Sequence, residues 1–108
     1  MLLADIYNGY EAAGELLDKE APAALSFKIA DLIVSLESKR KAAQITINKL
    51  PKDENGKPDY EELCKLMNTE TDISVPRLTR KEIEEGFQII SPKVVIALMP
   101  FLEVEDDG

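Results

Sequence analysis

The stretch from Pro22 to Leu50 has the pattern of one long amphipathic helix, around which a domain of this size must be organised. Proline is favoured in the first turn of a helix and cannot continue one, so Pro22 and Pro51 mark its two ends. Apolar residues recur between them at helical spacing and form one broad face: Leu25, Ile29, Leu32, Ile33, Leu36, Ala43, Ile47 and Leu50. We expect the stretch to pack against the rest of the protein along this face.

A shorter helical pattern precedes the long one. Its apolar residues are three and four positions apart: Leu3, Ile6, Tyr10, Ala13 and Leu17. At 1.5 Å per residue this helix would be about 27 Å long and the next about 42 Å, and their short connection predicts an antiparallel hairpin. The end of the longer helix, with Ile45, Ile47 and Leu50, would then need cover from the C-terminal half or from a second copy of the chain in a homodimer.

Residues 51–108 contain start signals for several short helices. Asp59 with Glu62, and Thr79 with Glu82, have the spacing of a capping box, in which the first side chain caps the helix and the second reaches back to the cap residue. Ser91-Pro92 has the pattern of a further helix start. We therefore expect two or three short helices in this half.

Two segments of the same half predict short strands. Ile73 and Val75 alternate with polar residues in the segment 71–75, and the segment 87–90 is a second apolar run. We expect the two segments to pair, because lone strands leave backbone groups without partners. The predicted fold is therefore α+β and mainly helical. It is one domain over residues 1–108, with a helical hairpin at 1–50 and a small acidic α+β subdomain at 51–108.

The net negative charge is confined to the C-terminal half. Residues 1–52 hold seven acidic and seven basic side chains, whereas residues 53–108 hold fourteen and six, which accounts for the net charge of −8. A negative field repels phosphates and argues against direct binding of nucleic acid. It serves either solubility or contact with a basic protein surface. The one basic run, Lys39-Arg40-Lys41, has no interleaved aromatic residues and is a weak signal for phosphate binding.

Most catalytic and metal-binding side chains are missing from the sequence. It has no histidine and a single cysteine, Cys64, whose place between leucines predicts a half-buried structural thiol. The turn 53–56 has glycine at its fourth position, whereas a calcium-binding EF-hand loop needs glycine at the sixth. We therefore expect no enzyme activity, no metal and no cofactor.

The sequence also bears on the cellular compartment. No apolar run approaches the roughly 20 residues needed to span a bilayer. The first residues lack the basic region of a secretory signal, and a single cysteine cannot form an internal disulfide. These features predict a cytosolic protein that does not insert into a membrane.

Several segments together resemble a family of small proteins encoded by tailed phages and prophages of Gram-positive bacteria. The resemblance is carried by Tyr7-Asn8-Gly9-Tyr10 with Leu16-Leu17, Ser26-Phe27-Lys28-Ile29-Ala30 with Leu32, Asp53-Glu54-Asn55-Gly56, Asn68-Thr69-Glu70 and Ile90-Ser91-Pro92. The chain departs from the family at Phe27, where the family tends to have tyrosine, and in a shorter, proline-broken segment after the long helix. The resemblance implies a phage gene expressed in the cytoplasm of a bacterial host, and it carries over no catalytic residues.

These observations lead to two main hypotheses, each with a protein partner. In the first, the protein is a non-enzymatic assembly or tail accessory factor that contacts a phage structural protein, or a second copy of itself, through Ile45, Ile47 and Leu50. In the second, it inhibits a host defence nuclease, as anti-CRISPR proteins do, by placing carboxylates in a basic groove that holds nucleic acid. The contact residues would then be Glu82, Glu84, Glu85, Glu103, Glu105, Asp106 and Asp107. A third hypothesis, direct nucleic-acid binding through the basic run, has the weakest support.

Overall fold

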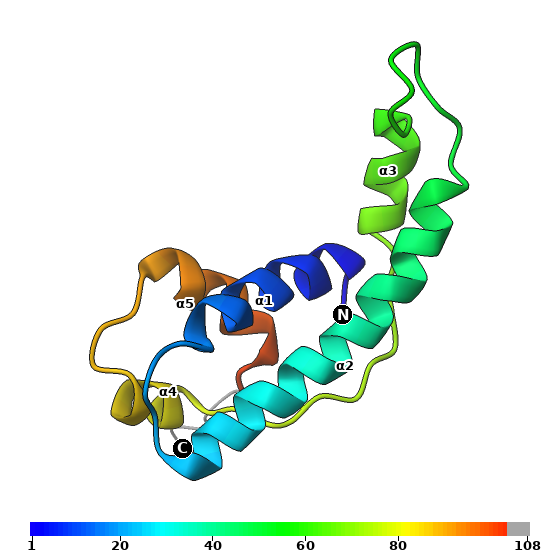
Figure 1. The fold of residues 1–108 in the computed structure, drawn as a ribbon. Helices are drawn as coiled ribbons and strands as arrows, with labels where there is room; N and C mark the ends of the chain where they lie inside the picture. Colours follow the sequence, from blue (N-terminus) through cyan, green and yellow to red (C-terminus); the bar gives the residue numbers. More distant parts are fainter. Residues whose placement is uncertain (104–108) are drawn as a thin grey trace.

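The computed structural model describes residues 1–103, and this part of the chain is built from helices (Figure 1). In chain order they are α1 (Leu3–Leu16), α2 (Ala23–Asn48), α3 (Tyr60–Met67), α4 (Arg80–Gly86), α5 (Pro92–Leu98) and the 3-10 helix η1 (Met99–Phe101). The long helix α2 runs along one side of the molecule. In Figure 1, α4 lies near the N-terminal end of α2 and α3 lies at its C-terminal end.

The predicted α+β class is wrong, because residues 1–103 form no strand or sheet. The segments 71–75 and 87–90 are not paired with each other, and the described backbone forms only isolated bridges, such as the one between Leu2 and Glu70. Ile73, Val75, Phe87 and Ile90 of these segments pack in or against the helical core instead, whereas Ile89 is exposed. In the segment 71–75, half-buried residues alternate with exposed ones, as they do in a strand that covers a core, which explains the misleading pattern there.

The boundaries of the first two helices are close to the predicted ones. α2 begins directly after Pro22 and ends at Asn48, before Pro51. α1 and α2 pack together and run in opposite directions (Figure 1). In the last turn of α1 the buried leucine is Leu16, whereas the predicted Leu17 is 59% exposed beyond the helix end. This difference arises because α1 also packs against α5, a contact that local spacing does not indicate.

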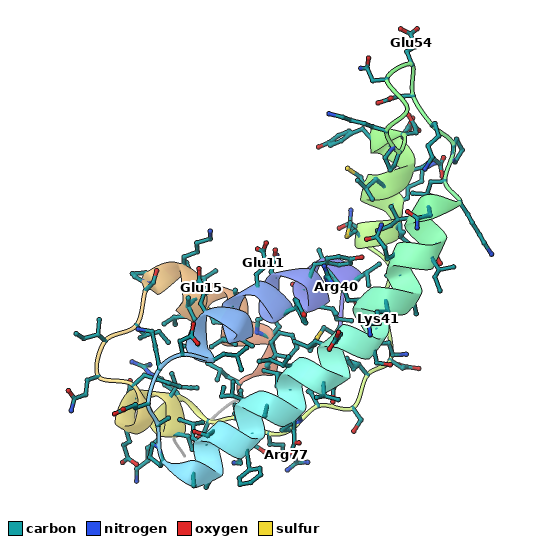
Figure 2. All side chains as sticks on the ribbon, in the orientation of Figure 1. Glu11, Glu15, Arg40, Lys41, Glu54 and Arg77 are labelled. Atoms are coloured by element: carbon teal, nitrogen blue, oxygen red, sulfur yellow. The ribbon has the colours of Figure 1, made fainter. Side chains whose placement is uncertain are left out.

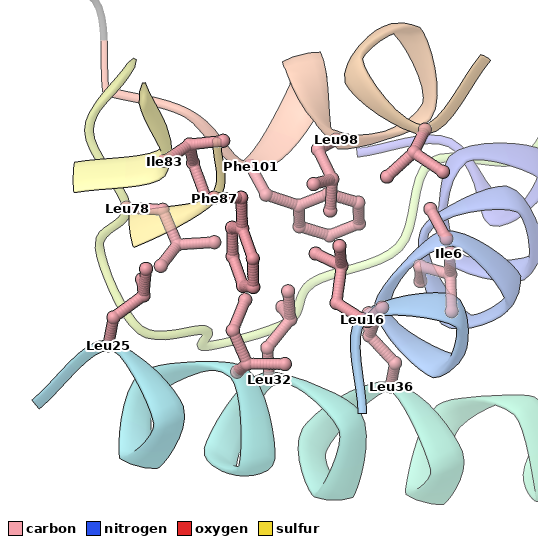
Figure 3. Packing of buried hydrophobic residues seen from close by; sticks show 14 of the residues in the cluster. Ile6, Leu16, Leu25, Leu32, Leu36, Leu78, Ile83, Phe87, Leu98 and Phe101 are labelled. Atoms are coloured by element: carbon pink, nitrogen blue, oxygen red, sulfur yellow. The ribbon is translucent and has the colours of Figure 1, made fainter. Parts of the chain in front are cut away.

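Both halves of the chain contribute to one hydrophobic core (Figure 3). Leu32 and Leu36 project into it from α2 and are fully buried, as are Leu78 and Leu98 from the C-terminal half. Full burial of one such side chain contributes roughly 1.5–3 kcal/mol. The two predicted parts of the chain, 1–50 and 51–108, therefore share one core.

Gly9 allows α1 and η1 to approach closely. A Cβ atom at Gly9 would lie 2.6 Å from Cζ of the Phe101 ring. The ring is only 4% exposed, so it has little room to move away. Glycine is therefore needed here for packing, although it destabilises a helix interior by about 1 kcal/mol relative to alanine.

The C-terminal end of α2 has different surroundings. After Asn48 the chain turns back through an isolated bridge between Lys52 and Pro58, and α3 then runs beside the end of α2 (Figure 1). Asp59 caps α3 by accepting a hydrogen bond from the backbone N–H of Glu62, one of the two bonds of the predicted capping box. No residue of α3 is buried. The end of α2 is thus covered by the C-terminal half of the same chain, but only thinly.

Candidate protein-interaction surfaces

α2 is apolar on two opposite faces. Phe27 and Ile45 are 18 residues apart, about five turns of helix, so they lie on the same face. Leu36 is midway between them, about two and a half turns from each, and lies on the opposite face. Leu36 is fully buried, whereas Phe27 is 73% and Ile45 60% exposed. The helix is therefore not simply amphipathic, because its outer side also carries apolar residues.

Phe27, Val34 and Ile45 define this outer face, which we call the outer stripe of α2. Val34 is seven residues after Phe27, on the same side of the helix, and is 68% exposed. Ala30, which is also exposed, lies between them, and polar residues such as Lys41 interrupt the stripe before Ile45. Single exposed apolar residues are ordinary on protein surfaces, but their alignment on one helix face is typical of a helix that binds a partner.

Only one of the three predicted apolar contact residues belongs to the outer stripe. Ile45 is part of it. Ile47 is 8% exposed and faces the core side of α2, so it offers little surface to a partner. Leu50 is half-buried just beyond the helix end. The prediction missed Phe27 and Val34, although the 18-residue spacing of Phe27 and Ile45 was a signal that could have revealed them.

The described acidic residues that were predicted as contacts each face a cation of the same chain. The separations are 2.8 Å for Glu84–Arg80, 4.0 Å for Glu85–Lys81, 3.1 Å for Glu103–Arg77 and 2.7 Å for Glu82–Lys28. The remaining three lie outside the described residues: Glu105, Asp106 and Asp107. Exposed ion pairs contribute little to stability, but each cation offsets the charge of its partner. These four carboxylates thus do not form an uncompensated acidic surface.

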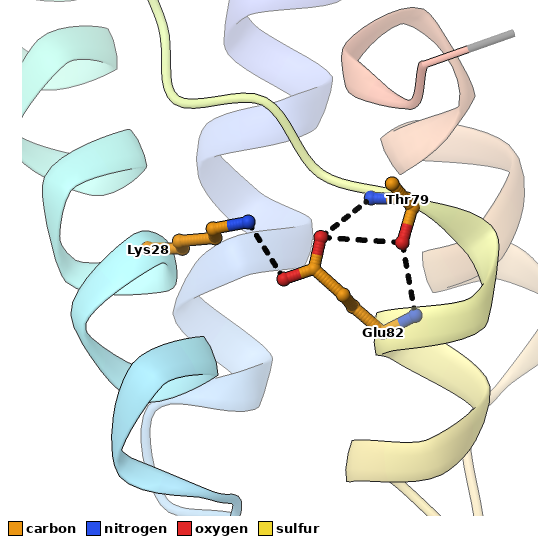
Figure 4. A network of polar contacts seen from close by, with 3 residues as sticks. All are labelled: Lys28, Thr79 and Glu82. Carbon is orange, nitrogen blue, oxygen red and sulfur yellow. Dashed lines mark hydrogen bonds and ion pairs between the residues drawn. The ribbon is translucent and has the colours of Figure 1, made fainter.

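Glu82 joins α4 to α2 (Figure 4). One carboxylate oxygen accepts a hydrogen bond from Lys28 Nζ at 2.7 Å, and the other accepts from the backbone N–H and the hydroxyl of Thr79, both at 3.2 Å. The Thr79 hydroxyl in turn accepts from the backbone N–H of Glu82, which completes the predicted capping box. The hydrogen bond from Lys28 lowers the pKa of Glu82 most, burial opposes it, and the bonds from Thr79 add to the lowering. Glu82 therefore has a structural role in this chain.

The basic run at 39–41 is not arranged as a phosphate site (Figure 2). Arg40 lies over two rings of α1, with its guanidinium carbon 4.8 Å from the centroid of Tyr10 and 5.9 Å from that of Tyr7. Burial raises the pKa of Tyr7, and the nearby Arg40 charge opposes that rise. Lys41 Nζ lies 3.4 Å from Glu37, one turn earlier on α2. Two of the three cations are thus engaged within the chain.

Residues 1–103 do not contain a group of three or more Cys, His, Asp or Glu side chains placed to hold a metal ion. Cys64 is half-buried on α3, as predicted. Within the same residues, none of the helices has both the length and the apolar character that crossing a membrane requires.

Comparisons with other proteins do not assign the chain to a family. No protein-family model, curated protein or solved structure matches it. The relation to phage proteins therefore rests on the sequence segments alone and stays a prediction.

Proposed function

We propose that this protein is a non-catalytic protein–protein interaction factor of a tailed phage, with an assembly or tail accessory role inside the bacterial host. The outer stripe of α2 is its contact surface. The proposal is carried by one observation, that Phe27, Val34 and Ile45 are exposed on the side of α2 opposite the core. Burial of this apolar area against a partner removes it from water, which favours the complex. The phage context comes from the resemblance of the sequence.

The dimensions of the outer stripe suit a contact made by one helix. From Phe27 to Ile45 it extends about 27 Å at 1.5 Å per residue. Phe27 and Val34 have the seven-residue spacing of anchors with which a helix binds a groove or another helix. Phe27 is the main anchor, because aromatic side chains contribute most to such interfaces. Asp31, which is exposed, flanks the stripe, and Lys41 interrupts it, so polar groups border the apolar residues.

The alternative function, inhibition of a host defence nuclease by an acidic surface, has less support. It depends on carboxylates that are free to replace phosphates in a basic groove. The four described candidates, Glu82, Glu84, Glu85 and Glu103, each face a cation of this chain. We therefore favour solubility as the role of the acidic half.

The test compares three forms of the tagged protein: the native chain, Phe27→Ser/Val34→Ser, and the control Ile89→Ser. Ile89 is 81% exposed on the α4–α5 connection, so the control makes the same kind of change away from α2. Each form is used to capture proteins from phage-infected host lysate, and the captured proteins are identified by mass spectrometry. Light scattering after gel filtration measures the oligomeric state of each form.

We expect the native chain and the control to capture the same phage structural protein, or to self-associate to the same extent. The double variant should lose that partner while keeping its circular dichroism spectrum. An unchanged partner in the double variant would remove the outer stripe as the contact surface. Capture of a host nuclease by all three forms would favour the alternative function.

A further inference from the structure

A groove of about 550 Å³ lies between α1 and α5. Its α1 wall includes Glu11, Gly14 and Glu15, and its α5 wall includes Lys93, Ile96 and Ala97. Figure 2 shows Glu11 and Glu15 on the side of α1 that points away from α2. The volume lies within the range of roughly 300–1,000 Å³ that is usual for ligand sites. The groove is therefore a binding-site candidate separate from the outer stripe.

Two carboxylates in the groove have no cation partner among residues 1–103. Glu11 and Glu15 are one helical turn apart and both exposed. Like charges at this spacing destabilise a helix by about 0.2–0.5 kcal/mol. Neither side chain forms an ion pair or hydrogen bond with the described part of the chain, and the Lys93 ammonium on the opposite wall is likewise unpaired there. A cation bound between the two carboxylates would remove their repulsion.

Gly14 leaves open space beside these carboxylates. Glycine just after a helix end often provides a positive φ, and glycine inside a helix often allows a close contact, as Gly9 does with Phe101. The φ of Gly14 is not positive, and a Cβ atom there would meet nothing within 4 Å. The fold therefore does not require glycine at position 14. The absent side chain instead keeps this part of the groove free.

We propose that the groove binds an arginine side chain within a short, partly apolar segment of another protein. The planar guanidinium has five N–H donors, enough to pair with both Glu11 and Glu15, and guanidinium–carboxylate pairs are often bidentate. The Lys93 ammonium on the opposite wall repels the guanidinium, so in this proposal it donates to a backbone carbonyl of the segment and not to the arginine side chain. Ile96, which is 66% exposed, offers an apolar contact to a neighbouring side chain.

The dimensions and charge of the groove narrow the choice of ligand. α5 has seven residues and is about 10 Å long, so the groove holds two or three residues of a segment and not a whole helix. The two carboxylates repel phosphates, which disfavours nucleic acid. The site does not depend on the proposed function, because it lies on α1 and α5 and not on the outer stripe of α2.

The test is a titration of the ¹⁵N-labelled protein with a short peptide of Arg, Leu and Ala, followed by backbone amide chemical shifts. A peptide of the same length with Glu in place of Arg is the ligand control. The groove variant is Glu11→Gln/Glu15→Gln. Its matched control is Glu54→Gln/Glu61→Gln, which removes the same charge from exposed positions in the turn before α3 and on α3.

A second variant tests the groove without changing charge. Gly14→Tyr places a large side chain in the open space, and Gly14→Ala is its control. Because a Cβ atom at Gly14 meets nothing within 4 Å, both variants should fold.

We expect the Arg peptide to shift the amides of Gly14 and Ala97, and the Glu peptide to leave them in place. Because a hydrogen bond to a charged group contributes about 1.5–3 kcal/mol, the groove variant should bind at least about tenfold more weakly. Gly14→Tyr should abolish the shifts, whereas Gly14→Ala and the Glu54/Glu61 control should retain them. The proposal is overturned by an absence of shifts at millimolar peptide, by shifts confined to other helices, or by equal binding to the native chain and the groove variant.

Discussion

The core region and the far end of α2 are held by different kinds of contact. In the core region, which comprises α1, α4, α5, η1 and α2 up to Ala43, buried side chains from distant parts of the sequence meet on one face of α2. At the far end, residues 44–68, no residue of α3 is buried. Ile47 is buried there but lies outside the main hydrophobic cluster. We call residues 44–68 the extension.

Local hydrogen bonds define the turn of the extension. The Asp53 carboxylate accepts from the backbone N–H groups of Asn55 and Lys57 at 2.8 and 3.0 Å, and Gly56 provides the positive φ of 76° that the turn requires. Leu66 and Met67 of α3 pack against the main hydrophobic cluster, but both are only partly buried, so the extension buries less apolar area than the core region. Regions of this kind open at a lower free energy than a packed core. The same helix α2 should therefore be stable at one end and fray at the other.

The largest expected effect compares a buried residue from each region. Leu32→Ala removes a fully buried side chain from the core, and we expect a loss of 2–5 kcal/mol in the free energy of unfolding, of the order seen for such cavities. Ile47→Ala should cost about 2 kcal/mol or less, because its cover is thin and can collapse. Urea unfolding followed by circular dichroism measures both. Equal losses would show that Ile47 in the extension is packed as tightly as Leu32 in the core region.

The next largest effect is a difference in stability between alanine variants of two glycines in α1, Gly9 and Gly14. Gly9→Ala should destabilise the protein by about 1–3 kcal/mol, because the new methyl group collides with the buried Phe101 ring. Gly14→Ala is the matched control and should stabilise the protein by up to about 1 kcal/mol, since the Cβ has free space and alanine favours helix. Thermal unfolding of both variants gives the comparison. A stable Gly9→Ala variant would mean that η1 is not fixed against α1.

The sequence predicted the elements whose signals are local. The prolines at 22 and 51 marked the ends of α2 to within a few residues, and the pair Thr79 and Glu82 predicted the start of α4, because a capping box involves only residues of the same turn. The segments 71–75 and 87–90 were mistaken for strands for the opposite reason. Whether an extended segment pairs with another strand or lies on helices depends on distant residues.

The candidate surfaces were less predictable than the helices. The outer stripe had a signal in the spacing of Phe27 and Ile45, which went unused because the broad apolar face with Leu32 and Leu36 dominated the pattern. The sequence contained almost no signal for the groove. Its walls come from residues 8–15 and 93–97, which only the tertiary fold brings together. The open surroundings of Gly14 are likewise a property of the tertiary fold.

A smaller effect tests the extension alone. Asp59→Ala removes the cap of α3, a change that costs about 0.5–2 kcal/mol when the helix is coupled to global folding. The bond from Glu62 N–H is long, at 3.4 Å, so we expect the low end of this range. Amide hydrogen exchange should become faster in α3 while the core helices keep their protection. Faster exchange throughout α1 and α2 would contradict the division into two regions.

The smallest effect concerns the polar contact between α2 and α4 in the core region. Glu82→Gln keeps a side chain that can complete the capping box but removes the ion pair with Lys28. Because both side chains are partly exposed, we expect a loss below about 1 kcal/mol, and less at high salt. This contact joins residues 54 positions apart, so its loss should lower global stability, unlike the loss of the Asp59 cap.

The pH dependence of this pair has a defined sign. Lys28 and Thr79 lower the pKa of Glu82 in the folded protein below its ordinary value of 4.5, so the folded state favours the charged carboxylate. The stabilisation is therefore complete above pH 4.5 and is lost as the pH falls through the lower, folded pKa. The difference in unfolding free energy between the native chain and Glu82→Gln should stay constant near neutral pH and shrink in acid. A difference that grows in acid would show that Glu82 is held protonated, which the bond from Lys28 forbids.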